Sequence, residues 1–453
     1  MKHVRLQLLA ASFMSLACGS FVLARLAAPH LGNQTWVPAQ STAPARDQSK
    51  SQKLSNPLND LLDEAQRDID ANNFEAAVPP LQKFIAKKPD VAYGHFQLGY
   101  AFTALKRGDE AQAEYERAIE LDPKMPEAYL NLGVLLLDKR QFAAAVAPLS
   151  KAVDLLPSQS RPRALLAVAQ DRSGDQEAAA RSFEGVLHFD PNDVTANHYL
   201  GDIDLRRGKP AEAESRFRHA LELQPDAPEI LLGLAQSLEA QNKPEVADAY
   251  RKYLNVMPGD SGTRARLIHL LMNAQEYDAA LVELERADGG KAPSLDSLKV
   301  RADIQIAQKN LDGAIVTLRQ AVALAPSDAQ LVGGLGRVYL QKRDFPAAEK
   351  ELRTASQMDP KNIAYWKDLS ATYYLSGNCS ATLSTLQFIA KMETPGAGAW
   401  FIRALCYDKL HQLRPALDAY GQFLALEQGK SSDQVWQAQE RSRVLKHMLE
   451  AKR

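Results

Sequence analysis

The sequence predicts an all-α protein that is built from about eleven consecutive helical hairpins. Ten prolines follow one another at steps of 33 to 35 residues, as the ends of a repeated two-helix unit would. Small residues recur 24 and 12 positions before most of these prolines, where the two helices of a hairpin would pack closely. Between them, apolar residues recur at intervals of three and four, the period of amphipathic helices. The marking prolines are Pro89, Pro123, Pro157, Pro191, Pro225, Pro258, Pro293, Pro326, Pro360 and Pro395.

The first 28 residues are predicted to be an export signal. Lys2, His3 and Arg5 precede an apolar stretch over residues 6–23, and small residues follow it. A basic start, an apolar segment and a small-residue exit are typical of a secretory signal. Two alternatives stay open: an uncleaved membrane anchor over residues 6–24, and a lipoprotein whose lipid is attached at Cys18.

Residues 29–57 are predicted to be a disordered tether. This segment is rich in Pro, Ser, Thr, Gln and Ala, and Trp36 is its single aromatic residue. Such a composition buries too little apolar surface to offset the entropy lost on ordering.

Residues 58–428 form the predicted repeat array. A Gly or Asn separates the two helices of several hairpins, and the proline ends the second helix because it lacks a backbone N–H. One repeat shows Leu98-Gly99, Ala111, Tyr115 and Pro123, and another shows Leu200-Gly201, Ala213, Phe217 and Pro225. This pattern resembles the tetratricopeptide repeat.

The resemblance implies a right-handed superhelical solenoid whose first helices line a concave groove for a protein or an extended peptide. A carboxylate-binding clamp of Lys and Asn, which some members of the family use, is absent from the corresponding positions. Residues 255–294 depart from the regular spacing and would form either a bend or a harmless loop variation.

Residues 429–453 are predicted to cap the array. Ser431, Ser432 and Asp433 are a helix start signal, and apolar residues then recur among charged ones. A terminal helix of this kind covers the last hydrophobic face of a solenoid.

The composition and motifs do not indicate an enzyme or a nucleic-acid-binding protein. The net charge is −1, without the strongly basic surface that binding to nucleic acid needs. We expect no cofactor and no metal, because neither a phosphate-binding loop in its proper context nor His or Cys pairs at zinc spacing are present. His198, Asp202 and Arg206 share one helix face, and we interpret them as a solvated ion-pair ladder rather than as a catalytic set.

The predicted groove has an apolar part and a polar part. An exposed apolar strip flanked by charge would be a recognition surface. The alternative is that the first repeat, or the tether with Trp36, covers the strip. The candidate residues are Tyr93, Phe96, Tyr100, Leu130, Val134 and Leu137 in the apolar part, and Asp171, Arg172, His198, Asp202 and Arg206 in the polar part.

A disulfide is predicted between Cys379 and Cys406. Loss of the signal would leave these two cysteines in an oxidising compartment. In the repeat register Cys379 begins a second helix and Cys406 lies near the end of the next first helix, and antiparallel neighbours bring such positions together. The alternative is a pair of buried thiols that fill helix contacts.

These features favour an exported, periplasmic or envelope-associated adaptor that binds a protein or peptide partner. The second interpretation is an accessory subunit that positions a separately encoded envelope enzyme for polysaccharide synthesis or export.

Overall fold

The computed structural model describes residues 57–427 and 432–450, and this part of the chain is an all-α repeat solenoid. Its 23 helices fall into two units, divided between Val246 and Ala247. The first unit holds α1 Pro57–Asp70, α2 Phe74–Lys87, α3 Ala92–Ala104, α4 Gly108–Leu121, α5 Pro126–Asp138, α6 Phe142–Leu155, α7 Ser160–Ser173, α8 Gln176–Phe189, α9 Val194–Arg206, α10 Pro210–Leu223 and α11 Pro228–Ala240. The second holds α12 Val246–Val256, α13 Ser261–Asn273, α14 Tyr277–Asp288, α15 Leu295–Ala307, α16 Leu311–Leu324, α17 Ala329–Lys342, α18 Phe345–Met358, α19 Ile363–Leu375, α20 Cys379–Ile389, α21 Ala397–Lys409, α22 Leu413–Glu427 and α23 Ser432–Glu450.

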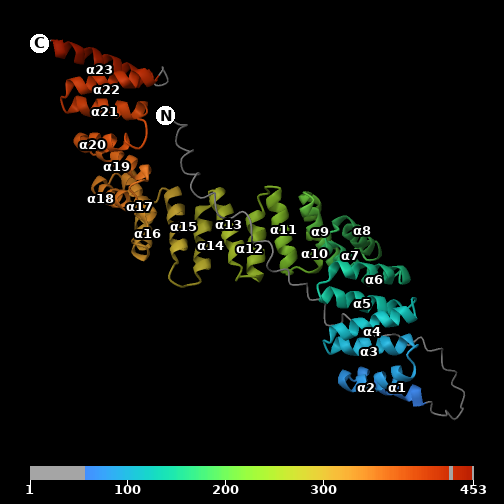
Figure 1. Ribbon diagram of the computed structural model, residues 1–453. Coiled ribbons are helices and arrows are strands. Elements are labelled where there is room, and N and C mark those ends of the chain that lie inside the picture. Colours follow the sequence, from blue (N-terminus) through green and yellow to red (C-terminus); the bar gives the residue numbers. More distant parts are fainter. Residues whose placement is uncertain (1–56, 428–431, 451–453) are drawn as a thin grey trace. The chain divides into compact units, whose positions relative to one another are not determined.

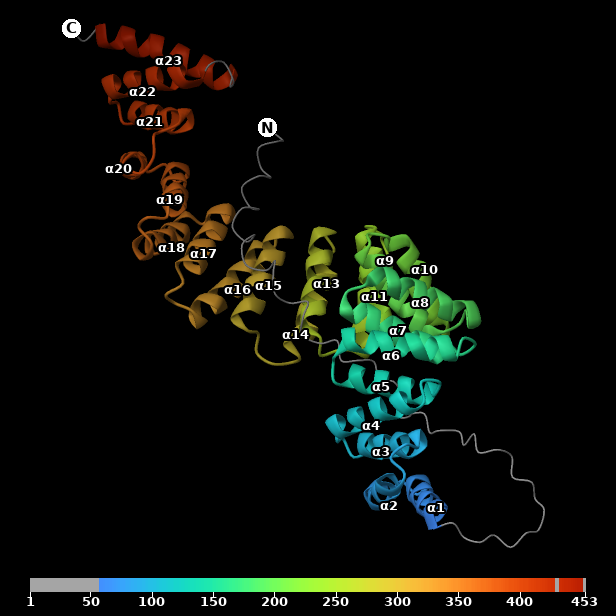
Figure 2. The ribbon, with the colours of Figure 1, turned by 45° about the vertical axis from the view of Figure 1, so that its right-hand side comes forward.

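Within each unit, consecutive helices pack as hairpins, and consecutive hairpins pack on one another. In the first unit α1 pairs with α2, and this pattern continues to α9 with α10 (Figures 1 and 2). In the second unit α13 pairs with α14, and the pattern continues to α21 with α22, on which α23 packs. The predicted hairpin repeats are therefore confirmed, and the predicted terminal helix follows the last hairpin.

Every hairpin turns on one residue in the left-handed backbone conformation. These residues lie 33 or 34 positions apart along the chain, so the turn keeps the register of the repeat. Glycine occupies three of the eleven turns, whereas Lys, Arg, Gln, His or Asn occupies the others at a cost of about 1 kcal/mol or more. The turn residues are Asn72, Lys106, Arg140, Gly174, Gly208, Asn242, Gln275, Lys309, Arg343, Gly377 and His411.

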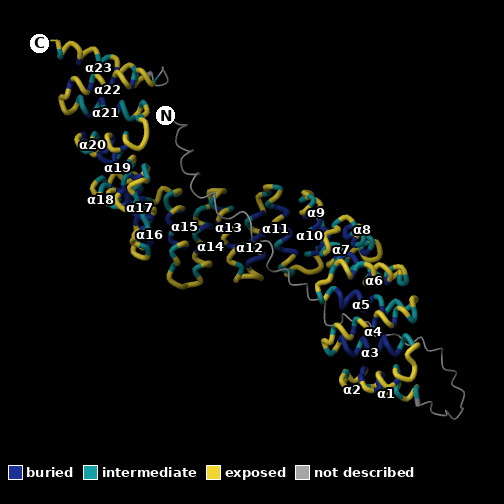
Figure 3. Tube along the Cα trace, in the orientation of Figure 1, coloured by how far each residue is buried: buried dark blue, intermediate teal, exposed yellow. Residues whose placement is uncertain are grey.

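The small residues predicted inside the hairpins lie where two helices meet. A Cβ atom added at Gly201 would be 2.7 Å from the ring of Phe217, and one added at Gly99 would be 2.9 Å from the ring of Tyr115. Real Cβ atoms do not come so close to other carbons, so glycine is what lets these aromatic rings reach the first helix. Buried residues accordingly lie along the inner faces of the helices (Figure 3).

Side chains join successive repeats through the marking prolines. The side chains of Asn197, Arg264 and Trp366 each donate a hydrogen bond to a proline carbonyl six residues earlier, at 3.2, 3.0 and 3.0 Å. The proline thus ends one helix, and its carbonyl oxygen holds the first turn of the next.

The predicted export signal, and the tether except for its last residue, lie outside the described residues. The irregular segment 255–294 lies wholly in the second unit, after the division at Val246. Its helices α13 and α14 are 13 and 12 residues long.

Candidate functional site

The five polar groove candidates lie together across α7 and α9, the adjacent first helices of two repeats. Asp171 of α7 forms an ion pair with Arg206 of α9. One turn earlier on α9, His198 Nε2 lies 3.5 Å from Asp202 Oδ2. Arg172 forms a side-chain hydrogen bond with Tyr199. The predicted ion-pair ladder on α9 therefore extends to α7, and we call these six residues the polar cluster.

Burial makes the charge of Asp202 unfavourable. Desolvation raises the pKa of the Asp202 carboxyl above its usual range, and the charge of Asp171 adds to this. His198, Arg206 and Arg172 oppose the increase without cancelling it. A further cation or hydrogen-bond donor that reaches this carboxylate therefore stabilises its charged form.

The sequence did not single out Tyr199, which anchors the polar cluster to the core. Its side chain is buried, and its ring stacks on Phe183 with ring centroids 5.0 Å apart. Burial raises the pKa of the Tyr199 hydroxyl, while the hydrogen bond with Arg172 lowers it. Tyr199 follows His198 on an amphipathic helix, between the groove positions and the core positions. This placement was the signal from which its role could have been predicted.

The prediction of an exposed apolar strip is wrong for Phe96, Leu130 and Val134. These side chains are between 0 and 2% exposed and belong to the hydrophobic core of the first unit. Leu137 is partly buried against the same core. Phe96 packs against Tyr115 of α4, the second helix of its own hairpin, with ring centroids 5.9 Å apart, so its side chain is part of the interior of the repeat.

The two tyrosines of the strip contact the first repeat, which was the alternative interpretation. The Tyr93 hydroxyl donates a hydrogen bond to Gln66 Oε1 of α1 at 3.2 Å and accepts one from Gln97 Nε2. The ring of Tyr100 packs edge-on against Phe74 of α2, with centroids 6.1 Å apart. Burial raises the pKa of both tyrosine hydroxyls.

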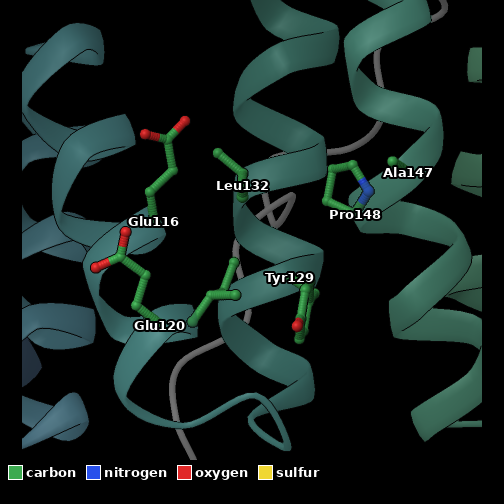
Figure 4. A pocket seen from close by; sticks show the side chains of 7 residues that line it. Glu116, Glu120, Tyr129, Leu132, Ala147 and Pro148 are labelled. Carbon is green, nitrogen blue, oxygen red and sulfur yellow. The ribbon is translucent and has the colours of Figure 1, made fainter.

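An open cleft of about 410 Å³ lies between α4 and α6, over α5. Glu116 and Glu120 extend into it from α4, and Tyr129 and Leu132 of α5 lie opposite Pro148 of α6 (Figure 4). Its lining is mostly apolar, with carboxylates on one side only. The cleft offers a partner an apolar surface with negative charge only, whereas the polar cluster brings acidic and basic side chains together.

The two cysteines are neighbours but are not bridged. Cys379 and Cys406 are both free and buried, at 6 and 0% exposure, so the predicted disulfide is not present in the structure. Burial raises the pKa of the Cys406 thiol to about 12, helped by its hydrogen bond with Cys379. The helix register therefore places these thiols in contact, and the bridge itself stays a prediction.

Over the ranges 57–427 and 432–450, no three His, Cys, Asp or Glu residues are grouped so that they could hold a metal ion. Within the same ranges, no helix has the length and apolar character needed to cross a bilayer.

Models of tetratricopeptide families match several parts of the chain. Two models described as "Tetratricopeptide repeat" match residues 305–372 and residues 62–111 and 199–261, and a "TPR repeat" model matches residues 99–139. The matched segments lie in both units.

Three curated relatives are similar to parts of this chain. A DnaJ homolog subfamily C member 7 homolog of Schizosaccharomyces pombe is 25% identical over 55% of this chain and 56% of its own length. The human protein O-mannosyl-transferase TMTC3 is 22% identical over 67% of this chain and 35% of its own length. Cellulose synthase 2 operon protein C of Komagataeibacter xylinus is 27% identical over 41% of this chain and 13% of its own length. The chain thus spans from about an eighth to just over half of the lengths of these relatives.

Two solved structures are similar to parts of the chain, at low identity and low TM-score. MamA of Desulfovibrio magneticus is 20% identical, with a TM-score of 0.36, over 39% of this chain and 99% of its own. YrrB, described as a TPR protein with an unusual peptide-binding site, is 18% identical, with a TM-score of 0.38, over 42% of this chain and 96% of its own.

Proposed function

The chain is a tetratricopeptide repeat protein, and from this we propose that it acts as an adaptor that binds a protein or an extended peptide at the polar cluster of α7 and α9. The repeat fold supports a role as a protein-interaction scaffold. The observation that carries the proposal is the convergence of two carboxylates, two guanidinium groups and one imidazole from two adjacent first helices. Such a surface recognises a partner by charge and hydrogen bonding rather than by burial of a large apolar area.

The raised pKa of Asp202 indicates the chemistry of the partner. Burial disfavours the Asp202 carboxylate, and the nearby bases relieve this only in part. A Lys or Arg side chain of the partner would supply the missing interaction, and Arg206 would then be free to share its guanidinium between Asp171 and an acidic or carbonyl oxygen of the peptide. We therefore propose a polar partner that carries at least one basic side chain.

Asp202→Asn is expected to stabilise the first unit and to weaken partner binding. A carboxyl whose folded-state pKa is raised contributes stability below its unfolded pKa and loses it as the pH rises through the folded value. At neutral pH removal of the charge is therefore favourable for folding, while a basic group of the partner loses its counter-ion. The measurements are hydrogen exchange in α9 and quantitative pull-down from envelope extract.

Matched controls make this test decisive. Glu184→Gln and Arg181→Ala change exposed residues of α8 and should leave both measurements as in the wild type. Arg206→Ala should reduce capture of the same partner as Asp202→Asn does. A partner that Asp202→Asn and Arg206→Ala both retain at the wild-type level would contradict the assignment of the site.

A second candidate function is that of an accessory subunit which positions a separately encoded envelope enzyme for polysaccharide synthesis or export. The supporting observation is the similarity to cellulose synthase operon proteins C of two Komagataeibacter species, at 27 and 29% identity over 41 and 32% of this chain. Recovery of a synthase complex in the same pull-down would favour this function over a single peptide-bearing partner. In either case we propose that the chain works by binding, and turnover of a substrate by the purified chain alone would contradict both functions.

We propose that the protein is exported and works in the periplasm or at the cell envelope. The basic, apolar and small-residue succession over residues 1–28 supports this location. Amino-terminal sequencing of protein from the envelope fraction should give a start between about residues 20 and 30 if the signal is cleaved. Protein with an intact Met1 that is recovered only from the cytosol would contradict export.

In exported protein, Cys379 and Cys406 are expected to form a disulfide. The two thiols would lose two electrons and two protons to a protein disulfide oxidant of that compartment, and one S–S bond would form. Burial raises the pKa of the Cys406 thiol and so disfavours the reactive thiolate, and we therefore expect this step to occur during folding, before the thiols are buried. The bridge would close a loop of 27 residues and stabilise the last repeats by roughly 3–4 kcal/mol.

Thiol counting in denatured, unreduced protein measures the bridge. Protein from the oxidising compartment should show neither of these two thiols free, and protein made in a reducing cytosol should show both. Two free thiols at Cys379 and Cys406 in exported protein would mean that they only fill a helix contact.

A further inference from the structure

The open cleft between α4 and α6 owes its shape to two small residues of α6. Ala147 and Pro148 line it on the α6 side, and Ala147 is exposed. One repeat later Arg181 takes the place of Ala147, and two repeats later Arg216 takes the place of Pro148. With a methyl group and a proline ring at these places, no long side chain of α6 covers α5, and the cleft stays open.

The floor of the cleft is apolar and is held by the core. Leu132 of α5 is 7% exposed and belongs to the hydrophobic core of the first unit. Tyr129 of α5 and Ile119 of α4 are partly buried against the same core. These side chains offer a fixed apolar surface to the stem of a ligand side chain, without a rearrangement of the protein.

The α4 side of the cleft carries a carboxylate that lacks a counter-ion. Glu116 is exposed and accepts a hydrogen bond from the neutral amide of Gln112 at 2.9 Å. Among the described residues, no Lys, Arg or His forms an ion pair with Glu116. Glu120, the other carboxylate of the lining, pairs with Arg117 at 2.8 Å on the surface. Glu116 therefore gives this side of the cleft a negative charge that is available to a partner.

The α6 side of the cleft offers a backbone acceptor. Pro148 lies inside α6 and has no N–H, so the carbonyl oxygen of Ala144 lacks the donor that a regular helix would supply four residues later. Residues four apart share one face of a helix, so this carbonyl lies on the side of α6 that bears Pro148. Acceptors thus stand on both sides of an apolar floor, and none of the described lining residues is Lys, Arg or His.

We propose that this cleft binds an arginine side chain of a protein partner. The apolar stem of the arginine packs on Ile119 and Leu132, and its guanidinium group lies against the ring of Tyr129. The guanidinium donates hydrogen bonds to the carboxylate of Glu116 on one side and to the carbonyl oxygen of Ala144 on the other. Arginine fits better than lysine, because its planar group stacks on an aromatic ring and carries N–H donors that point in several directions.

This site is separate from the polar cluster. The cleft lies between the second helices α4 and α6, whereas the polar cluster lies on the first helices α7 and α9. A partner with several basic side chains could use both sites, but neither site needs the other. The proposal therefore goes beyond the proposed function and is tested by itself.

A titration of the full chain with a defined peptide tests the proposal. The probe is an acetylated and amidated pentapeptide of one arginine among glycines, and the readout is the NMR signals of the Ile119 and Leu132 methyl groups. These signals should shift with a dissociation constant on the order of 1 mM, because a single side chain buries little surface. The same peptide with citrulline, which has a similar shape but no charge, should bind at least about fivefold more weakly.

Two outcomes of the titration would overturn the proposal. One is the absence of any shift of the two methyl signals up to about 20 mM peptide, well above the expected dissociation constant. The other is a shift that grows with protein concentration when no peptide is present, which would assign the cleft to a second copy of the chain.

Variants show whether the named groups form the site. Glu116→Gln should weaken peptide binding about fivefold, and Ala147→Gln should block it by placing a long side chain in the cleft. Glu110→Gln removes an exposed carboxylate of α4 that pairs with Arg107 outside the cleft, and this control should bind as the wild type does. Asp202→Asn should also leave the methyl shifts unchanged, so failure of one site is distinguishable from failure of the other. Equal affinity of the wild type, Glu116→Gln and Ala147→Gln would rule out the site.

Discussion

Replacement of Glu283 by glutamine is expected to destabilise α13 and α14 by about 3–5 kcal/mol, because it leaves a buried arginine without its counter-charge. Glu283 is 2% exposed, and its Oε2 lies 2.8 Å from Nη1 of Arg264, which is 7% exposed. Its Oε1 accepts from Arg286 at 2.7 Å and lies 3.7 Å from Arg251. Arg286 and Arg251 can turn to water, whereas Arg264 cannot.

Hydrogen exchange over residues 261–288 measures this change locally, which suits a repeat protein whose unfolding need not be two-state. Glu285→Gln, two residues away on the same helix and 64% exposed in its side chain, should change the exchange by no more than about 0.5 kcal/mol. A double variant with Arg264→Met and Glu283→Met should recover most of the loss, because no buried charge then remains unpaired. Equal destabilisation by the single and double variants would show that packing, not charge, explains the effect.

Phe217→Ala is expected to destabilise α9 and α10 by about 3–5 kcal/mol. Its side chain is fully buried between two glycines of neighbouring first helices. Added Cβ atoms at Gly201 and Gly233 would lie 2.7 and 2.5 Å from its ring. Loss of the ring leaves a cavity between three helices that cannot close without moving the backbone.

The same substitution should also weaken partner binding, since α9 carries four of the six residues of the polar cluster. Phe189→Ala is the matched control, because that ring is 48% exposed at the end of α8, and its removal should cost less than about 1 kcal/mol. Phe217→Leu fills more of the space and should recover part of the stability. If the Phe217→Ala variant exchanges hydrogen in α9 and α10 at the same rate as the wild type, this account of the hairpin is contradicted.

The repeat and its elements could be predicted from the sequence because their causes are local or periodic. Proline ends each second helix through its own ring, and glycine at a crossing such as Gly201 permits a contact that any larger residue would prevent. The terminal helix could be predicted from the helix start signal before Asp433 and the apolar spacing that follows it. Each of these features depends on residues within one repeat. The 34-residue period of this one sequence was therefore enough to predict them.

The site depended on contacts between repeats, which the period does not specify. Val134 has the same place in its repeat as Asp202, but Val134 is buried in the core of the first unit, whereas Asp202 stays polar beside Arg206 and His198. The turns show the same limit: Lys106 and Arg140 adopt the left-handed conformation that glycine favours, because packing of the two helices fixes the turn whatever residue occupies it. The sequence by itself determined the class of fold, the number of hairpins and where most of them end. The tertiary structure alone decided which side chains of the first helices reach a partner, because exposure depends on the distance between neighbouring helices.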